Sequence, residues 1–459
     1  MKYISTRGNA PILNFEEALL TGLASDGGLY LPASWPKINT SDVPKGKYWE
    51  KATFIMLPFV GDFLNEQELL RLTKRAYSHF PTDEAAPLRK LKNNKFLLEL
   101  YHGPTLAFKD FAMLLLAELF ESALEKKGKK ITILGATSGD TGSAAIEAFK
   151  NSNYADVFIL FPKGRVSETQ RRQMTTVSSK SVYPIEIDGT FDDCQNLVKS
   201  LFQEKKFREE TNLAAINSIN WGRVAAQIVY YFTSFELLGE EKVSFSVPTG
   251  NFGDILAGWV AKKMGLPISQ LIVATNENDI LNRAILSGDY SLGKVNATIS
   301  PSMDIQISSN FERILFEAYN RDSREINSLM NELVSNRGFT IKDSALNFIK
   351  NDFISNKASA EDTKKTIRKF YKEENIIIDP HTAVGLFAAN EIGLNETSII
   401  SLGTAHPAKF PEAVFDALNV YPEIPKKLEE CLKGEENFTT MDKDPNFLKE
   451  YIKENILEL

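Results

Sequence analysis

Lys109 follows a tight turn, His102-Gly103-Pro104-Thr105, and stands at the predicted start of a helix. Glycine frees the backbone of this turn and proline fixes it, so the chain is expected to reverse direction just before the lysine. A helix N-terminus carries partial positive charge, which disfavours an ammonium group there. With Phe108 and Phe111 beside it, the Lys109 amine is expected to lose its proton more easily than the amine of a surface lysine.

A neutral amine can condense with an aldehyde, which is what pyridoxal phosphate requires from its protein. The alternative interpretation is that the ammonium of Lys109 extends to water from an ordinary helix. The residues around Lys109 do not decide between the two. A cofactor of this kind also needs groups that bind its phosphate and its ring nitrogen.

A glycine-rich segment, Pro248-Thr249-Gly250-Asn251-Phe252-Gly253-Asp254, joins a predicted strand to a predicted helix. Its two glycines allow the backbone to wrap an anion closely, and the amides at a helix N-terminus suit phosphate. We therefore expect Gly250, Asn251, Phe252, Gly253 and Asp254 to bind a cofactor phosphate. A plain strand-to-helix turn is the alternative.

A second loop, Gly135-Ala136-Thr137-Ser138-Gly139-Asp140-Thr141-Gly142, places hydroxyls and amides at another helix start. Such a loop suits a carboxylate or a phosphate. It lacks the Gly-Lys-Ser/Thr ending of a nucleotide P-loop and the Gly-x-Gly-x-x-Gly spacing of a dinucleotide fingerprint. The alternative is that Asp140 or Thr141 only caps the helix.

Two further strand ends carry cationic and amide groups. Asn217, Ser218 and Arg223 lie at a strand-to-helix junction, where a guanidinium suits bidentate binding of phosphate or carboxylate. The alternative is that Asn220 caps the helix and Arg223 lies in solvent. Lys163 belongs either to an anion-binding site or to a solvated basic loop.

Thr404 follows a predicted strand at 398–402 near the end of the chain. A hydroxyl at a strand end can face the pyridine nitrogen of a cofactor without forcing its protonation. A structural threonine is the alternative.

The elements that must position these groups alternate between short β-rich runs and helical runs, as in parallel α/β domains. Strands are predicted at 95–101, 130–134, 157–161, 182–187, 212–216, 242–247, 271–275 and 398–402, and helices at 110–127, 142–149, 168–176, 194–204, 222–238 and from 254 to about 265. Right-handed crossovers would arrange the strands in two adjoining sheets with helices on both faces.

The two ends of this α/β region have a different pattern. Residues 1–94 contain mainly helical stretches, such as 14–23 and 66–77, between prolines, which indicates an N-terminal helical subdomain. Residues 321–374 are rich in Lys, Asn and Asp with periodic apolar positions, so we expect helices on the outside of the protein.

Composition excludes several classes of protein. With 459 residues the chain suggests two or three domains, and its formal net charge of -7 argues against nucleic acid as a partner. Glu118 and Glu121 interrupt the longest apolar stretch, and the N-terminus has no signal-peptide core, so a cytoplasmic protein without a membrane segment is expected. Cys194 and Cys431 are expected to be free thiols, and the four histidines lack zinc-site spacing, so no metal is expected.

Together these segments resemble the threonine synthase family, pyridoxal-phosphate enzymes of the tryptophan-synthase-β-like fold (fold type II). The resemblance runs from 3–8 and 26–30 to 403–410, and it is most specific at 102–110 and 135–142. It implies that Lys109 binds pyridoxal 5'-phosphate covalently, that Gly250 to Asp254 cradle the cofactor phosphate, and that Thr404 faces the ring nitrogen.

Asp140 is a further cofactor-binding candidate on this resemblance. Relatives in the wider fold have an asparagine there that contacts the phenolic oxygen of the cofactor. A carboxylate in that place would repel a phenolate, so the contact does not carry over directly.

The resemblance also implies the reaction, in which O-phosphohomoserine and water give L-threonine and phosphate by γ-elimination and then addition of water at Cβ, the last step of threonine biosynthesis. A site for this reaction must hold two phosphates at once. The candidates for the substrate carboxylate are Thr137, Ser138 and Thr141, and those for its phosphate are Lys163, Asn217, Ser218 and Arg223.

The expected fold class is therefore α/β, with two doubly wound, mainly parallel sheet domains, the cofactor between them, and an N-terminal mostly helical subdomain at 1–94. Residues 95–459 would form the catalytic region, with a smaller α/β subdomain at about 112–225 inserted in the larger one. A monomer or a homodimer is expected. The open alternatives are a phospho-lyase that releases 2-oxobutyrate, a serine or threonine dehydratase, and a non-catalytic binding protein of the same fold.

Overall fold

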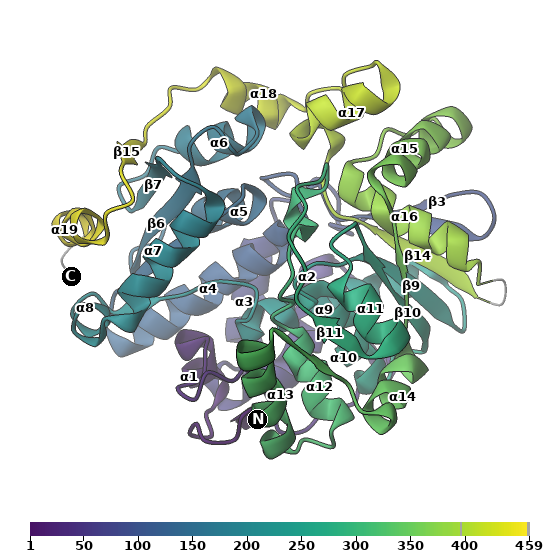
Figure 1. The fold of residues 1–459 in the computed structure, drawn as a ribbon, viewed down its shortest axis with the longest axis horizontal. Helices are drawn as coiled ribbons and strands as arrows, with labels where there is room; N and C mark the ends of the chain where they lie inside the picture. Colours follow the sequence, from purple (N-terminus) through teal and green to yellow (C-terminus); the bar gives the residue numbers. More distant parts are fainter. Residues whose placement is uncertain (395–396, 457–459) are drawn as a thin grey trace.

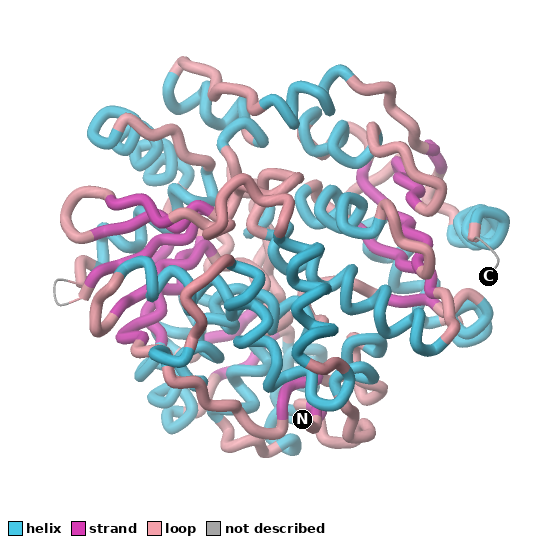
Figure 2. The backbone as a smooth tube through the Cα atoms, turned by 180° about the vertical axis from the view of Figure 1, so that it is seen from behind, coloured by secondary structure: helices cyan, strands magenta, loops and turns pink. Residues whose placement is uncertain are grey.

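Two mainly parallel β-sheets organise the structure, a computed structural model that describes residues 1–394 and 397–456. Figure 1 shows one lobe around each sheet, and Figure 2 shows the strands as two separate groups with helices between and around them. The expected α/β class with two parallel sheets is confirmed.

The larger sheet has six strands, in the spatial order β13 (Phe353–Lys357), β10 (Ile268–Thr275), β9 (Val243–Pro248), β14 (Ser398–Gly403), β4 (Lys95–Glu99) and β3 (Leu88–Lys90). Only β3 is antiparallel to its neighbour. All six residues of β14 and five of the six in β9 are buried, because helices cover both faces of a parallel sheet.

The smaller sheet has five parallel strands, in the order β15 (Thr439–Met441), β7 (Val182–Ile187), β6 (Ala155–Pro162), β5 (Ile131–Ala136) and β8 (Leu213–Ala214). The edge strand β15 comes from the far end of the chain. In Figure 1 the yellow C-terminal segment leaves the larger lobe and ends beside this sheet.

The N-terminal part contains a two-stranded antiparallel sheet and three helices: β1 (Tyr3–Ser5), β2 (Tyr30–Pro32), α1 (Phe15–Thr21), α2 (Tyr48–Val60) and α3 (Glu66–Tyr77). Its mostly helical character agrees with the sequence. None of the helices within 1–394 and 397–456 combines the length and apolarity needed to cross a membrane.

The remaining helices are α4 (Lys109–Lys127), α5 (Asp140–Phe149), α6 (Glu168–Thr175), α7 (Phe191–Gln203), α8 (Lys205–Glu210), α9 (Trp221–Leu238), α10 (Gly253–Met264), α11 (Ile280–Ser287), α12 (Phe311–Ala318), α13 (Ser323–Asn336), α14 (Asp343–Asp352), α15 (Ala360–Glu374), α16 (Pro380–Ile392), α17 (Pro411–Leu418), α18 (Lys426–Lys433) and α19 (Pro445–Asn455). Four short 3-10 helices add to these: η1 (Thr40–Asp42), η2 (Gly61–Phe63), η3 (Pro301–Met303) and η4 (Pro407–Lys409).

The prediction that residues 321–374 are helical was wrong in part. The helices α13, α14 and α15 form there, but so do the short strand β12 (Gly338–Thr340), paired with β11 (Asp289–Ser291), and β13, which completes the edge of the larger sheet. In β13 only Phe353 is buried, so the segment lacks the alternation of buried and exposed residues from which a strand is predicted. Pairing with β10, and not local pattern, makes this segment a strand.

Arg313 on α12 joins the N-terminal part to the rest of the molecule. Its buried guanidinium donates to the carbonyl oxygens of Tyr30, at 2.7 and 3.0 Å, and of Ile219, at 2.7 Å. It also donates to the Asn310 side chain, which in turn donates to the carbonyl of Asn251 at 3.0 Å. Burial lowers the pKa of Arg313 to about 9, so the group stays charged near neutral pH.

Replacing Arg313 with methionine is expected to lower the free energy of unfolding by about 3 kcal/mol, because several buried carbonyl groups lose their donor. The measurement is the midpoint of urea unfolding. The matched control is Arg324→Met, since the side chain of Arg324 is 92% exposed and its loss should change little. Equal midpoints for the two variants would contradict the assigned role of Arg313.

Candidate active site

One cavity lies where the carboxyl ends of strands from both sheets meet. Its lining comes from the segments that follow β4, β5, β9 and β14: Phe108, Lys109, Asp140, Thr141, Pro248 to Asp254, Thr404 and Ala405, together with Ser218, Arg223, Gln227, Ser302, Met303 and His381 from neighbouring elements. Ligand sites of open parallel sheets lie at this edge.

The turn before Lys109 is fixed by hydrogen bonds from Thr105 to Asp110 and by hydrogen bonds to the segment after β14. Asp110 accepts hydrogen bonds from the amide and the hydroxyl of Thr105, at 2.9 and 2.5 Å. A Cβ atom on Gly103 would overlap the Asp110 carboxylate, so this position requires glycine. Backbone hydrogen bonds from Phe108 to Thr404 and from His406 to Leu106 bind the turn to the segment after β14.

Lys109 is buried, so the interpretation that its ammonium extends to water is wrong. The amine lies 4.7 Å from the centre of the Phe108 ring and 3.5 Å from the nearer carboxylate oxygen of Asp140. Burial lowers the pKa of the Lys109 amine; Asp140 opposes this shift, and Lys409 and Arg223 add to it. The site therefore favours an amine that gives up its proton.

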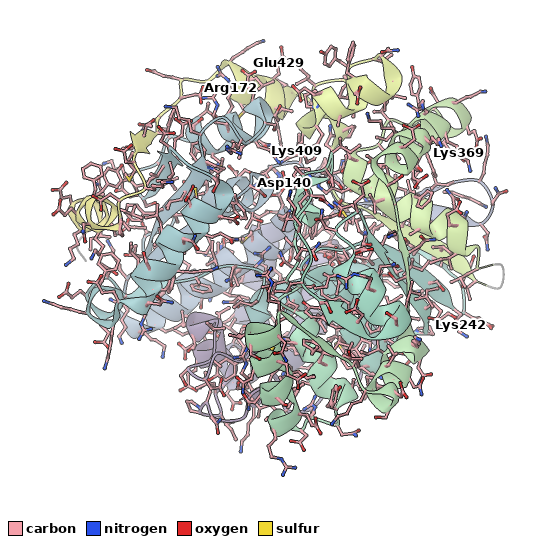
Figure 3. The ribbon with its side chains drawn as sticks, viewed as in Figure 1. Asp140, Arg172, Lys242, Lys369, Lys409 and Glu429 are labelled. Carbon is pink, nitrogen blue, oxygen red and sulfur yellow. The ribbon has the colours of Figure 1, made fainter. Side chains whose placement is uncertain are left out.

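Asp140 stands between two lysines. Its other carboxylate oxygen lies 3.1 Å from the amine of Lys409 and accepts a hydrogen bond from Gln170 at 2.9 Å. Figure 3 shows Asp140 and Lys409 side by side between the two lobes. Burial alone would raise the pKa of Asp140, but Lys409 and Lys109 hold it far below its ordinary value, so the carboxylate is ionised.

Lys409 was not among the site residues predicted from the sequence. A usable signal was present, because Lys409 resembles Lys109 in lying next to phenylalanine, Phe410, soon after a strand. His381 was also missed. Its ring bonds to Asp379 through Nδ1 at 2.9 Å, and its Nε2 accepts the Ser302 amide at 3.2 Å.

The loop at the start of α10 has the geometry of a phosphate cradle. Residues outside the loop donate hydrogen bonds to its carbonyl oxygens. The Ser308 hydroxyl donates to the Gly250 carbonyl at 2.7 Å, and the Asn310 backbone amide donates to the Asn251 carbonyl at 3.1 Å. The amides at the helix start have no intrahelical acceptor and are free for an anion. A Cβ atom on Gly250 would lie 3.0 Å from the Ser302 carbonyl, so the cradle has no room for a side chain there.

Asp254 lies in the same loop and is buried. One of its oxygens accepts hydrogen bonds from Tyr230 at 2.6 Å and Tyr231 at 2.9 Å, and the other has no partner among the described residues. Burial raises the pKa of Asp254 to about 6, against the effect of the two tyrosines.

Two more cavity residues carry buried polar atoms that have no partner within 1–394 and 397–456, namely the Thr404 hydroxyl and Nε of Arg223. Asn220 caps α9, as one alternative expected, but Arg223 is buried, so its predicted exposure to solvent was wrong. Burial lowers the pKa of Arg223 to about 10. Its charge therefore persists at neutral pH, although no carboxylate of the described residues pairs with it.

The structure separates the other candidates into two groups. Thr141 and Ser218 line the cavity. Lys163 and Asn217 are exposed, Ser138 is half-buried outside the lining, and the Thr137 hydroxyl accepts the amides of Gly139 and Gly142, both at 2.9 Å. The alternative that Asp140 or Thr141 caps α5 was wrong, because the cap is Gly139 without a side-chain bond.

Comparison with protein families gives three matches along the chain. Residues 2–77 match the family described as "Threonine synthase N terminus", residues 80–348 match "Pyridoxal-phosphate dependent enzyme", and residues 382–452 match "Threonine synthase, C-terminal".

Individual proteins give the same result. The chain is 46% identical to the threonine synthase of Pseudomonas aeruginosa, with 96% of each chain covered. Among solved structures it is similar to the pyridoxal-phosphate-bound threonine synthase of Brucella melitensis, with 47% identity, 99% of each chain covered and a TM-score of 0.97. It is also similar to yeast threonine synthase, with 41% identity, 99% and 98% covered and a TM-score of 0.94.

A Gly250→Ala variant is expected to bind pyridoxal phosphate at least about tenfold more weakly, because the new methyl group forces the cradle away from Ser302. Affinity is measured by the absorbance of the bound cofactor during titration of the apoprotein. Gly135→Ala is the control, since its Cβ would meet only a methyl carbon of Ile159, at 3.5 Å. Unchanged cofactor affinity in Gly250→Ala would contradict the assignment of this loop as the phosphate-binding loop.

Proposed function

This chain belongs to the threonine synthase family, and we propose that the cavity around Lys109 is where it converts O-phosphohomoserine and water into L-threonine and phosphate. One observation carries the proposal. A buried amine, an anion cradle, an unpartnered hydroxyl and a buried guanidinium whose Nε has no partner among the described residues line the same cavity.

The residues present fit pyridoxal 5'-phosphate. The Lys109 amine is placed to bind it covalently, the amides of Gly250, Asn251, Phe252, Gly253 and Asp254 to bind its phosphate, and the unpartnered Thr404 hydroxyl to meet its ring nitrogen. Asp140 would lie on the side of the phenolic oxygen. When bound, the cofactor supplies an aldehyde and a ring that withdraws electrons from the substrate carbons.

Lys109 then serves as the proton carrier. When not bonded to the cofactor, its amine, whose pKa burial lowers, would accept the Cα proton of the substrate and would later return a proton. The buried cavity limits stray water during these transfers, which favours ordered proton return over loss of the product as a ketoacid.

The substrate phosphate needs its own binding group, because the cradle at Gly250 is used by the cofactor. Arg223 is suited to this role: it is charged, buried, on the cavity wall, and without an acidic partner among the described residues. Ser218 lies beside it on the wall, and Thr141 is placed for the substrate carboxylate. Lys163, Asn217, Thr137 and Ser138 stay sequence-based candidates for these groups.

Several finer features belong to the same proposal. We expect the enzyme to act in the cytoplasm as a monomer or a homodimer, with its chain divided at about residue 94 into an N-terminal subdomain and a catalytic region. Threonine as the product, in place of 2-oxobutyrate, separates this function from that of a phospho-lyase, and turnover separates it from a binding protein.

Lys109→Ala is expected to abolish covalent cofactor attachment and to reduce threonine formation at least about 10³-fold, because both the anchor and the proton carrier are lost. Phosphate, threonine and 2-oxobutyrate are measured together after addition of O-phosphohomoserine. Lys126→Ala on the same helix is the control, since this lysine lies on the surface. Ketoacid without threonine from the unaltered protein would overturn the proposed reaction.

Arg223→Gln is expected to raise KM for O-phosphohomoserine about 30-fold, since one charge-assisted contact to a phosphate is worth about 2 kcal/mol, while cofactor affinity stays near that of the unaltered protein. Steady-state kinetics and cofactor titration give the two values. Lys163→Ala is the comparison. A larger rise of KM in Lys163→Ala than in Arg223→Gln would indicate that Lys163, and not Arg223, binds the substrate phosphate.

A further inference from the structure

Lys409 is the most completely buried cation of the site, with no exposed side-chain surface. Its ammonium has three acceptors: the Thr105 carbonyl at 2.6 Å, the Gln173 side-chain oxygen at 2.7 Å and the Asp140 carboxylate at 3.1 Å. An ammonium group has three N–H donors, so these acceptors satisfy all of them. The arrangement fits a lysine that keeps its charge.

Lys109 has a different environment, although it shares the same carboxylate. Among the described residues its one ion pair is with the other Asp140 oxygen, at 3.5 Å, and the centre of the Phe108 ring lies 4.7 Å from its amine. This contact is long for a charge-assisted hydrogen bond. Of the two lysines, Lys109 is the one that can become neutral at low cost.

We propose that Lys409 is a positioning residue whose ammonium is the permanent counter-ion of Asp140, so that the carboxylate does not hold a proton on Lys109. This inference rests on the proposed role of Lys109 as the cofactor lysine. Asp140 and Lys409 together carry no net charge. The pair can therefore stand beside the phenolic oxygen of a cofactor, where an unpaired carboxylate would repel it.

The position of Lys409 also explains how the pair is held. Lys409 belongs to η4, and its contacts reach Thr105 in the turn before Lys109 and Gln173 on α6 in the smaller lobe. Gln173 also donates to the Thr105 carbonyl at 3.0 Å. Three distant segments thus fix one ammonium against one carboxylate.

Other charged groups also act on Lys109, Asp140 and the neighbouring Asp254. Arg223 on α9 lowers the pKa of Lys109, His381 on α16 acts on Asp140, and Lys109 itself acts on Asp254 of α10. Among the described residues, neither Arg223 nor His381 binds the Asp140 carboxylate directly, whereas Lys109 contacts it at 3.5 Å. If Lys409 were removed, Lys109 would be the nearest cation to Asp140, and its pKa would rise.

The first test measures the pKa of Lys109 in the protein without cofactor, from the pH dependence of its reductive methylation by formaldehyde, read by peptide mass spectrometry. Lys409→Met is expected to raise this pKa by at least about one pH unit, and Asp140→Asn to lower it. The double variant is expected to return to within about half a unit of the unaltered protein, because it removes both charges.

Lys51→Met is the matched control, since Lys51 is a buried lysine whose ion pair with Glu236, at 2.6 Å, does not touch the cavity. It should leave the pKa of Lys109 unchanged even if it lowers stability. If Lys409→Met does not fold, the double variant is compared with Asp140→Asn. The pKa of Lys109 should be higher in the double variant than in Asp140→Asn.

The second test is a pH titration of the visible absorbance of pyridoxal phosphate bound at Lys109. The pKa read from the absorbance is expected to rise in Lys409→Met, to fall in Asp140→Asn and to stay near that of the unaltered protein in the double variant. An unchanged pKa in folded Lys409→Met, or a double variant as shifted as Lys409→Met alone, would overturn the inference. Absence of cofactor binding in the unaltered protein, with the shifts of the first test intact, would overturn the proposed function and leave the role of Lys409 standing.

Discussion

The site depends on a buried carboxylate that is shared by two lysines. Asp140 lies 3.1 Å from the Lys409 amine and 3.5 Å from the Lys109 amine, and the three groups are almost fully enclosed. Burying a charge costs much free energy unless a partner is present. One carboxylate can balance one ammonium, so the second lysine is stable there only when its amine gives up a proton or is used in a covalent bond.

The fold serves this arrangement by bringing strand ends from two sheets to one cavity. The turn before Lys109 is bonded directly to the segment after β14, through Phe108 and Leu106 on one side and Thr404 and His406 on the other. A third link runs through Arg313, which connects the N-terminal strand at Tyr30 to the loop at Asn251 by way of Asn310. The N-terminal part therefore supports the loop at Gly250 to Asp254 without lining the cavity.

Much of the site could be predicted from the sequence because its main parts are local. The turn 102–105, the glycines around Asn251 and the hydroxyl of Thr404 each follow a strand, and each signal lies within a few residues. The position of Lys409 next to Phe410 was a local signal, but the roles of Lys409 and His381 could not be predicted in this way, because they depend on partners at Asp140 and Ser302 that are far away in sequence. For the same reason the edge strand β13 was missed: its pairing with β10 gives it its structure.

The sequence by itself determined the alternation of strands and helices, the family, and the lysine that stands at a helix start. The alternation and the place of the lysine follow from short-range rules on backbone conformation and hydrophobic spacing, whereas the family was identified by the resemblance of its motifs. Only the tertiary structure decided which polar groups share the cavity: it buried Lys109 and Arg223, left Lys163 and Asn217 exposed, and placed Lys409 against Asp140. The physical reason is that burial and charge pairing are properties of the assembled strand ends, and Lys109, Asp140 and Lys409 come from three different segments.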